Sequence, residues 1–123
     1  MFDDPRMKTV RIAGFWLAAA FAFVMATLPH PPQLPGEPTD KVQHILAFAV
    51  LTILALSAYP RTPWGRVVLC LIAFGGLIEL VQAIPALHRD SDWRDWLADA
   101  GAVLAALAVV QIVHLGWRRR ASR

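Results

Sequence analysis

The chain has 123 residues, a formal net charge of +3, a hydrophobic content of 57% and a mean hydropathy of +0.48. Its apolar residues form long blocks, which is typical of a membrane protein and not of a soluble domain of this length. The basic residues flank these blocks instead of forming a stripe, which disfavours a nucleic-acid partner. The single cysteine, Cys70, cannot form an internal disulfide and is interpreted as a small apolar filler.

Four apolar blocks are long enough to cross a bilayer, since a spanning helix needs about 17–25 residues. A helix also satisfies its own backbone hydrogen bonds without closing a barrel. We therefore expect an all-α membrane protein, a four-helix bundle within one membrane domain at 12–115. A cytoplasmic N-terminal segment (1–11) and a basic cytoplasmic tail (116–123) would flank this domain. The four blocks are 12–28, 42–59, 67–84 and 96–115.

The first block has an alternative interpretation as a secretory signal, with cleavage at the "VMA" of 24–26. Asp3 and Asp4 disfavour it, because they interrupt the basic segment that such a signal begins with. Three further spans also follow. Cleavage would leave the orientation of those later spans unchanged.

The basic residues predict the orientation of the spans. Nine of them precede the first span, join the second to the third or follow the fourth, against three in the other two loops. The positive-inside rule then places both termini on the cytoplasmic side of the membrane. The outer side would carry the loop "PHPPQLPGEPTD" (29–40) and the loop "PALHRDSDWRD" (85–95). The nine are Arg6, Lys8, Arg11, Arg61, Arg66, Arg118, Arg119, Arg120 and Arg123; the three are Lys41, Arg89 and Arg94.

Polar side chains gather at the outer ends of the last three spans. On the second span Asp40 and His44 are one turn apart and share a face, and on the third span Glu79 and Gln82 do the same. The fourth span begins with an acidic stripe at i, i+3 and i+7, which continues as two small residues that let helices approach closely. This stripe consists of Asp92, Asp95, Asp99, Ala102 and Ala106.

Glu79 is an ionisable residue inside an apolar block, where a charge costs about 3 kcal/mol or more. His44, Glu79 and Asp99 should lie about 5–9 Å below the outer surface, at one depth. Gly75 and Gly76, one turn before Glu79, would let a neighbouring helix approach. We expect Glu79 to be compensated by Lys41, His44 and Arg89, and to form either a functional site or an interhelical tie.

Four segments resemble the VanZ-like family over about 39–109: "DKVQHILAF" (40–48), "GLIELVQ" (76–82), Arg89 and "DWLADAGA" (95–102). The family pattern is D-K-x-x-H-x-x-x-F/Y, then E-x-x-Q, then R, then D-x-x-A-N-x-x-G. This chain departs from it at Asp99, which stands where the family usually has asparagine and adds a negative charge. The resemblance implies a multi-pass protein of the bacterial cytoplasmic (inner) membrane with a role at the cell envelope, in a family named for teicoplanin (antibiotic) resistance.

The residues of these segments form the candidate site. His44, Glu79 and Asp95 are the candidate catalytic groups, and the same three with Asp99 are candidate ligands of a divalent metal. Imidazole and carboxylate together suit a hard or borderline divalent cation. The candidate ligand-binding residues are Asp40, Lys41, His44, Glu79, Gln82, Arg89, Asp95 and Asp99.

Three function classes follow from this site. The preferred one is an accessory or binding protein for a membrane lipid or lipid-linked envelope molecule. The second is an enzyme acting on such a lipid through acid–base or metal chemistry. The third is a small proton- or cation-coupled transporter subunit, which with four short spans would need to form a homo-oligomer.

Overall fold

A computed structural model of the chain describes residues 4–28, 40–87 and 92–123. The described residues form four long α-helices and one short 3₁₀ helix, and they contain no strand. Each long helix is long and apolar enough to cross a membrane. The predicted all-α, four-helix architecture is therefore confirmed. The elements are α1 (Pro5–Thr27), α2 (Asp40–Ala58), α3 (Trp64–Gln82), η1 (Pro85–Leu87) and α4 (Trp93–Ala121).

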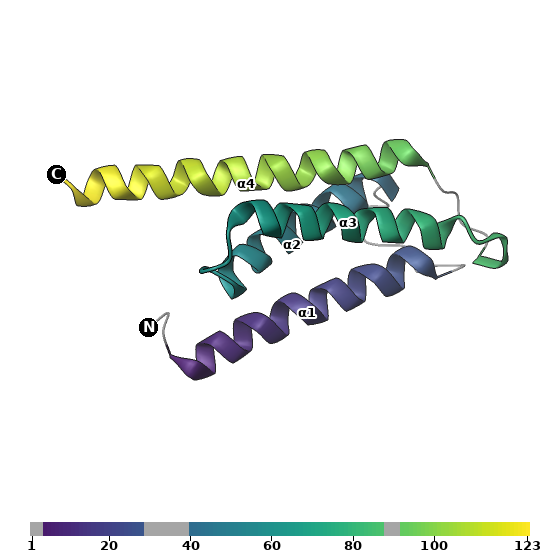
Figure 1. Ribbon diagram of the computed structural model, residues 1–123, viewed down its shortest axis with the longest axis horizontal. Coiled ribbons are helices and arrows are strands. Elements are labelled where there is room, and N and C mark those ends of the chain that lie inside the picture. Colours follow the sequence, from purple (N-terminus) through teal and green to yellow (C-terminus); the bar gives the residue numbers. More distant parts are fainter. Residues whose placement is uncertain (1–3, 29–39, 88–91) are drawn as a thin grey trace.

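The four helices run up and down along a common direction (Figure 1). α1 packs against α2 and α3, and α4 packs against the same two helices, most extensively against α2. The start of α1 and the end of α4 lie at one end of the bundle, where α4 projects beyond the other helices (Figure 1). In a membrane, these two helix ends therefore lie on the same side.

All four helices begin before the apolar blocks that predicted them, and for α1 and α4 an aspartate caps the earlier start. The Asp4 carboxylate accepts the backbone N–H of Arg6 at 2.9 Å, and Pro5 follows at the first helical position, where its fixed φ is favourable. The Asp92 carboxylate accepts the N–H of Arg94 at 2.9 Å, so α4 begins at Trp93 and not at residue 96. Capping therefore extends both helices beyond the hydrocarbon-length blocks.

α3 ends earlier than its apolar block, at Gln82 instead of residue 84. Pro85 explains this difference, because a proline disfavours helical backbone at the residue before it, here Ile84. The chain then turns through η1 toward the start of α4. This early end places Glu79 in the last turn of α3, close to the N-terminus of α4.

Aromatic and small apolar side chains hold the bundle together. Phe48 of α2 is 1% exposed, and its ring centroid lies 5.9 Å from that of Phe74 on α3. Phe74 in turn stacks on Phe23 of α1 at 6.3 Å. Ala102 and Ala106 of the predicted small-residue stripe are buried, as expected for close helix approach. Many large apolar side chains on the outer faces stay exposed, which suits a bundle whose surrounding solvent is lipid.

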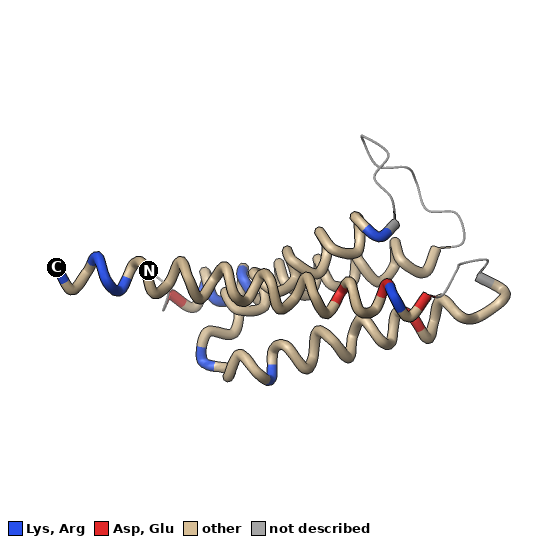
Figure 2. Tube along the Cα trace, turned by 90° about the horizontal axis from the view of Figure 1, so that it is seen from above, with Lys and Arg blue, Asp and Glu red and all other residues tan. Residues whose placement is uncertain are grey.

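Charge divides the two ends of the bundle (Figure 2). Among the described residues, every Asp and Glu except Asp4 lies at the start of α2, the end of α3 or the start of α4. We call this region the acidic end. Most lysines and arginines lie at the opposite end, where α1 begins and α4 ends (Figure 2).

Candidate functional site: a buried histidine–carboxylate cluster

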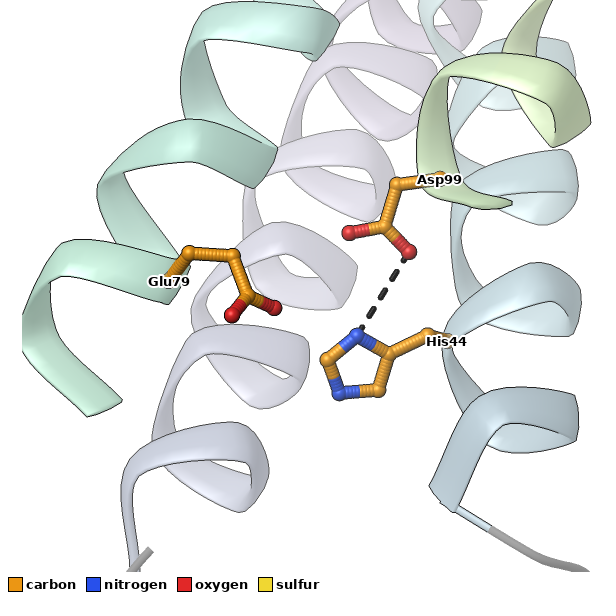
Figure 3. Close-up of side chains that lie close together, drawn as sticks. All are labelled: His44, Glu79 and Asp99. Atoms are coloured by element: carbon orange, nitrogen blue, oxygen red, sulfur yellow. Dashed lines mark ion pairs between the residues drawn. The ribbon is translucent and has the colours of Figure 1, made fainter. Parts of the chain in front are cut away.

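Three ionisable side chains from three helices meet near the acidic end (Figure 3). His44 comes from α2, Glu79 from α3 and Asp99 from α4, and all three are buried. One side-chain nitrogen or oxygen of each residue lies within 4.8 Å of those of the other two. We call these three residues the buried cluster. Two polar side chains, His44 and Asp99, therefore lie close to Glu79.

Asp99 is the most deeply buried member of the cluster, with an exposed fraction of 0%. Its Oδ1 lies 3.5 Å from His44 Nδ1, which is an ion pair when His44 is protonated. Within the described part of the chain, neither Asp99 oxygen accepts a hydrogen bond, and His44 Nδ1 makes none. An ionised carboxylate buried in this way is costly, so its environment must supply positive charge or donors.

Glu79 also ties α3 to α4. Its Oε2 accepts the backbone N–H of Asp92 at 3.0 Å, immediately before the first residue of α4. Helix starts leave backbone N–H groups without intrahelical partners, and they favour nearby negative charge. Glu79 therefore has a clear structural contact in addition to its place in the cluster.

Gln82 shares a face of α3 with Glu79, but its side chain makes its contact with α1 and not with the cluster. It is 3% exposed, and its Nε2 donates to the backbone oxygen of Ala26 at 2.8 Å. Ala26 lies in the last turn of α1, where carbonyl groups lack intrahelical donors. The amide of Gln82 thus caps α1 and ties it to α3.

The remaining predicted site residues lie outside the cluster or outside the described side chains. Lys41 is exposed and makes no ion pair with a described residue, so it does not compensate Glu79 there. Asp95 is half-buried and does not belong to the group of three. Asp40 begins α2, but its side chain is outside the description, and Arg89 lies outside the described residues.

Sequence reasoning missed two contacts that shape the site. The Asp92 backbone N–H is a partner of Glu79, and no sequence pattern pointed to it. Trp96 of α4 packs across α3, and its Nε1 donates to the backbone oxygen of Ile72 at 2.9 Å. The Gly75–Gly76 pair could have indicated this contact, since a Cβ at either position would lie within 3.5 Å of the Trp96 ring.

Comparison with protein-family models, curated proteins and solved structures finds no match to this chain. The fold and the cluster themselves define the class: an all-α protein with four helices fit to span a membrane, which carries buried ionisable groups from three of them. An imidazole between two carboxylates can bind a cation, hold a proton or orient a polar head group.

Proposed function

We propose that this chain is a VanZ-like protein of the bacterial cytoplasmic membrane with an accessory, ligand-binding role at the cell envelope. The buried cluster would form the polar part of a pocket for a membrane lipid or lipid-linked envelope molecule. The observation that carries this proposal is the convergence of His44, Glu79 and Asp99 within 4.8 Å of one another in an otherwise apolar bundle. Ionisable groups at such positions generally mark ligand or ion sites.

The free energies involved favour a functional role for the two buried carboxylates over a role in packing alone. Each charged carboxylate at membrane depth costs about 3 kcal/mol on insertion scales, while an interhelical hydrogen bond returns about 0.6 kcal/mol on average. Glu79 gains the Asp92 N–H, and Asp99 gains the 3.5 Å contact with His44. A single contact of this size is small beside the insertion cost, which favours a functional reason for keeping the two acids in the bundle.

Charge supports the orientation in the proposal. The basic residues cluster at the end that carries the start of α1 and the end of α4 (Figure 2). The positive-inside rule assigns that end to the cytoplasm and the acidic end to the outer leaflet. A pocket there would face lipid-linked molecules on the outer side of the membrane.

The family resemblance supports treating the three residues as one site. His44 comes from the D-K-x-x-H segment, Glu79 from the E-x-x-Q segment and Asp99 from the D-x-x-A-N segment. These segments lie far apart in the sequence, yet their ionisable residues converge (Figure 3). Each segment therefore contributes one polar group to the same pocket.

The test is complementation of a deletion strain, scored as sensitivity to teicoplanin and to detergent with membrane protein levels measured in parallel. Glu79→Gln and His44→Gln should fail to complement at normal membrane levels. His114→Gln, which changes an exposed imidazole on α4 outside the cluster, should complement and serves as the matched control. Asp99→Asn should also complement, because it restores the family's usual residue. Full complementation by both Glu79→Gln and His44→Gln would exclude the pocket.

A further inference from the structure

We propose that the buried cluster binds one divalent transition-metal ion of the Zn²⁺ or Mn²⁺ type, through His44, Glu79 and Asp99. This inference deepens the proposed function and rests on it in one respect, that both use the same pocket. It does not require the envelope role. One nitrogen ligand with two carboxylate oxygens is a donor set that suits such ions.

The geometry of the cluster is close to what a metal site requires. With bonds of about 2.1 Å in tetrahedral geometry, ligand atoms lie about 3.4 Å apart. The three candidate atoms already lie within 4.8 Å of one another, and His44 Nδ1 and Asp99 Oδ1 are 3.5 Å apart. Side-chain rotations that move atoms by about 1 Å would therefore complete the site without moving a helix. Because the three ligands come from three helices, a bound ion would also join α2, α3 and α4.

The carboxylate of Asp99 gives a second observation, independent of the ligand spacing, that points to a bound cation. It is 0% exposed, it points into the cluster (Figure 3), and within the described part of the chain neither of its carboxylate oxygens accepts a hydrogen bond. Gly75 leaves the room for it, since a Cβ there would lie 3.3 Å from Asp99 Oδ2. Carboxylates buried only for packing are normally satisfied by donors, and none of the described residues donates a hydrogen bond to Asp99. A cation in the cluster supplies the partner that these oxygens require.

Charge balance also favours a divalent ion over a protonated histidine. Two ionised carboxylates and one imidazolium leave a net charge of −1 in a low-dielectric bundle. Two carboxylates, a neutral imidazole and a divalent cation sum to zero, and metal binding indeed requires the deprotonated ligands. Charges buried away from water are tolerated when they are paired or bound to metal.

The Asp92 backbone would hold one metal ligand, Glu79, in place, and the ion would keep a coordination position for a further ligand. The Asp92 N–H donates to Glu79 Oε2 at 3.0 Å and so fixes the orientation of that carboxylate, as outer partners do in metal sites. Three protein ligands leave at least one coordination position for water or for an oxyanion. A phosphate of a lipid head group is an oxyanion of this kind, which links the ion to the proposed pocket.

The test uses full-length protein without an affinity tag, stripped of metal by a chelator and reconstituted in lipid nanodiscs. Isothermal titration with Zn²⁺ alone and with Mn²⁺ alone should show one ion per chain for at least one of the two metals. Asp99→Asn is the decisive variant, since it keeps the side-chain size and removes a charged ligand. It should lower the affinity by at least about 100-fold, because even outer-partner changes in metal sites cost 10–100-fold.

Two matched controls accompany it. Asp4→Asn changes an exposed carboxylate before α1, and His114→Gln changes an exposed imidazole on α4. Both should keep the wild-type affinity, whereas Glu79→Gln and His44→Gln should lose it as Asp99→Asn does. Thermal unfolding of each metal-free variant identifies any that fail to fold, and Asp99→Asn and Glu79→Gln are near-isosteric substitutions chosen to keep the fold.

Wild-type binding of both metals no tighter than that of Asp99→Asn would overturn the metal site, as would an equal loss in Asp4→Asn or His114→Gln. The experiments can exclude the proposed envelope role without excluding the metal site, and the reverse. Complementation by Asp99→Asn together with loss of its metal affinity would keep the metal site and the envelope role, and it would exclude a part for the ion in that role. Metal binding by wild-type protein with full complementation by Glu79→Gln and His44→Gln would keep the metal site and exclude the envelope pocket.

Discussion

A Cβ atom at Gly75 would lie 3.3 Å from Oδ2 of Asp99. The same atom would lie 3.4 Å from Cζ of Phe48 and 3.4 Å from Cδ1 of Trp96. Gly75 is therefore the point at which α3 makes room for side chains of α2 and α4. The carboxylate of Asp99 reaches the cluster by passing over Gly75, where α3 carries no side chain.

The first prediction concerns this close approach. Gly75→Val should destabilise the protein by about 1–3 kcal/mol, because two more methyl groups beyond Cβ overpack a site that is already tight at Cβ. Gly101→Val is the matched control, since nothing lies within 4 Å of a Cβ at that position. The measurement is reversible unfolding in mixed detergent micelles. Equal destabilisation by the two substitutions would contradict the packing described here.

The second prediction concerns the tie between α3 and α1. Gln82→Leu removes the amide that donates to the Ala26 oxygen at 2.8 Å and should cost about 0.6–1.7 kcal/mol, the range for interhelical hydrogen bonds in membranes. Gln111→Leu, at an exposed position of α4, should change the free energy of unfolding by less than that. The same unfolding assay measures both. If Gln82→Leu were neutral, the cap would contribute nothing to the docking of α1.

The third prediction concerns the Glu79–Asp92 contact. The amide oxygen of Glu79→Gln can still accept the Asp92 N–H, so that amide should keep its protection from hydrogen exchange. Glu79→Leu offers no acceptor, and the protection should fall. Amide exchange followed by NMR in nanodiscs measures this contact directly. The Arg94 N–H, which bonds to the Asp92 side chain at 2.9 Å, is the internal control. Unchanged protection of the Asp92 amide in Glu79→Leu would show that the contact is dispensable.

The fourth prediction concerns orientation. In a Cys70→Ser background, Ala86→Cys in η1 should react with an impermeant thiol reagent added to intact cells. Pro63→Cys, at the start of α3 and at the opposite end of the bundle, should react only after the membrane is permeabilised. Both positions are exposed, so accessibility from one side is the difference being measured. The reverse labelling pattern would place the acidic end in the cytoplasm.

The sequence was sufficient for the architecture. Apolar blocks of the right length predicted four helices, and the structure has four with ends shifted by caps and by Pro85. It also predicted the common depth of His44, Glu79 and Asp99, because each residue advances a helix by 1.5 Å from a known end. The small residues Gly75, Ala102 and Ala106 were correctly identified as points of close helix contact.

The sequence could not show which of the candidate residues form the buried cluster. Eight residues were candidates, and a periodic pattern could not separate Asp99, which joins His44 and Glu79, from Asp95, which does not. Nor could it show that Gln82 turns to α1 or that Glu79 finds the Asp92 backbone. Helical periodicity specifies which residues share a face and at what depth they lie. The rotation of each helix about its axis, and hence which side chains meet, depends on packing against neighbours, here on the gap that Gly75 leaves for Asp99.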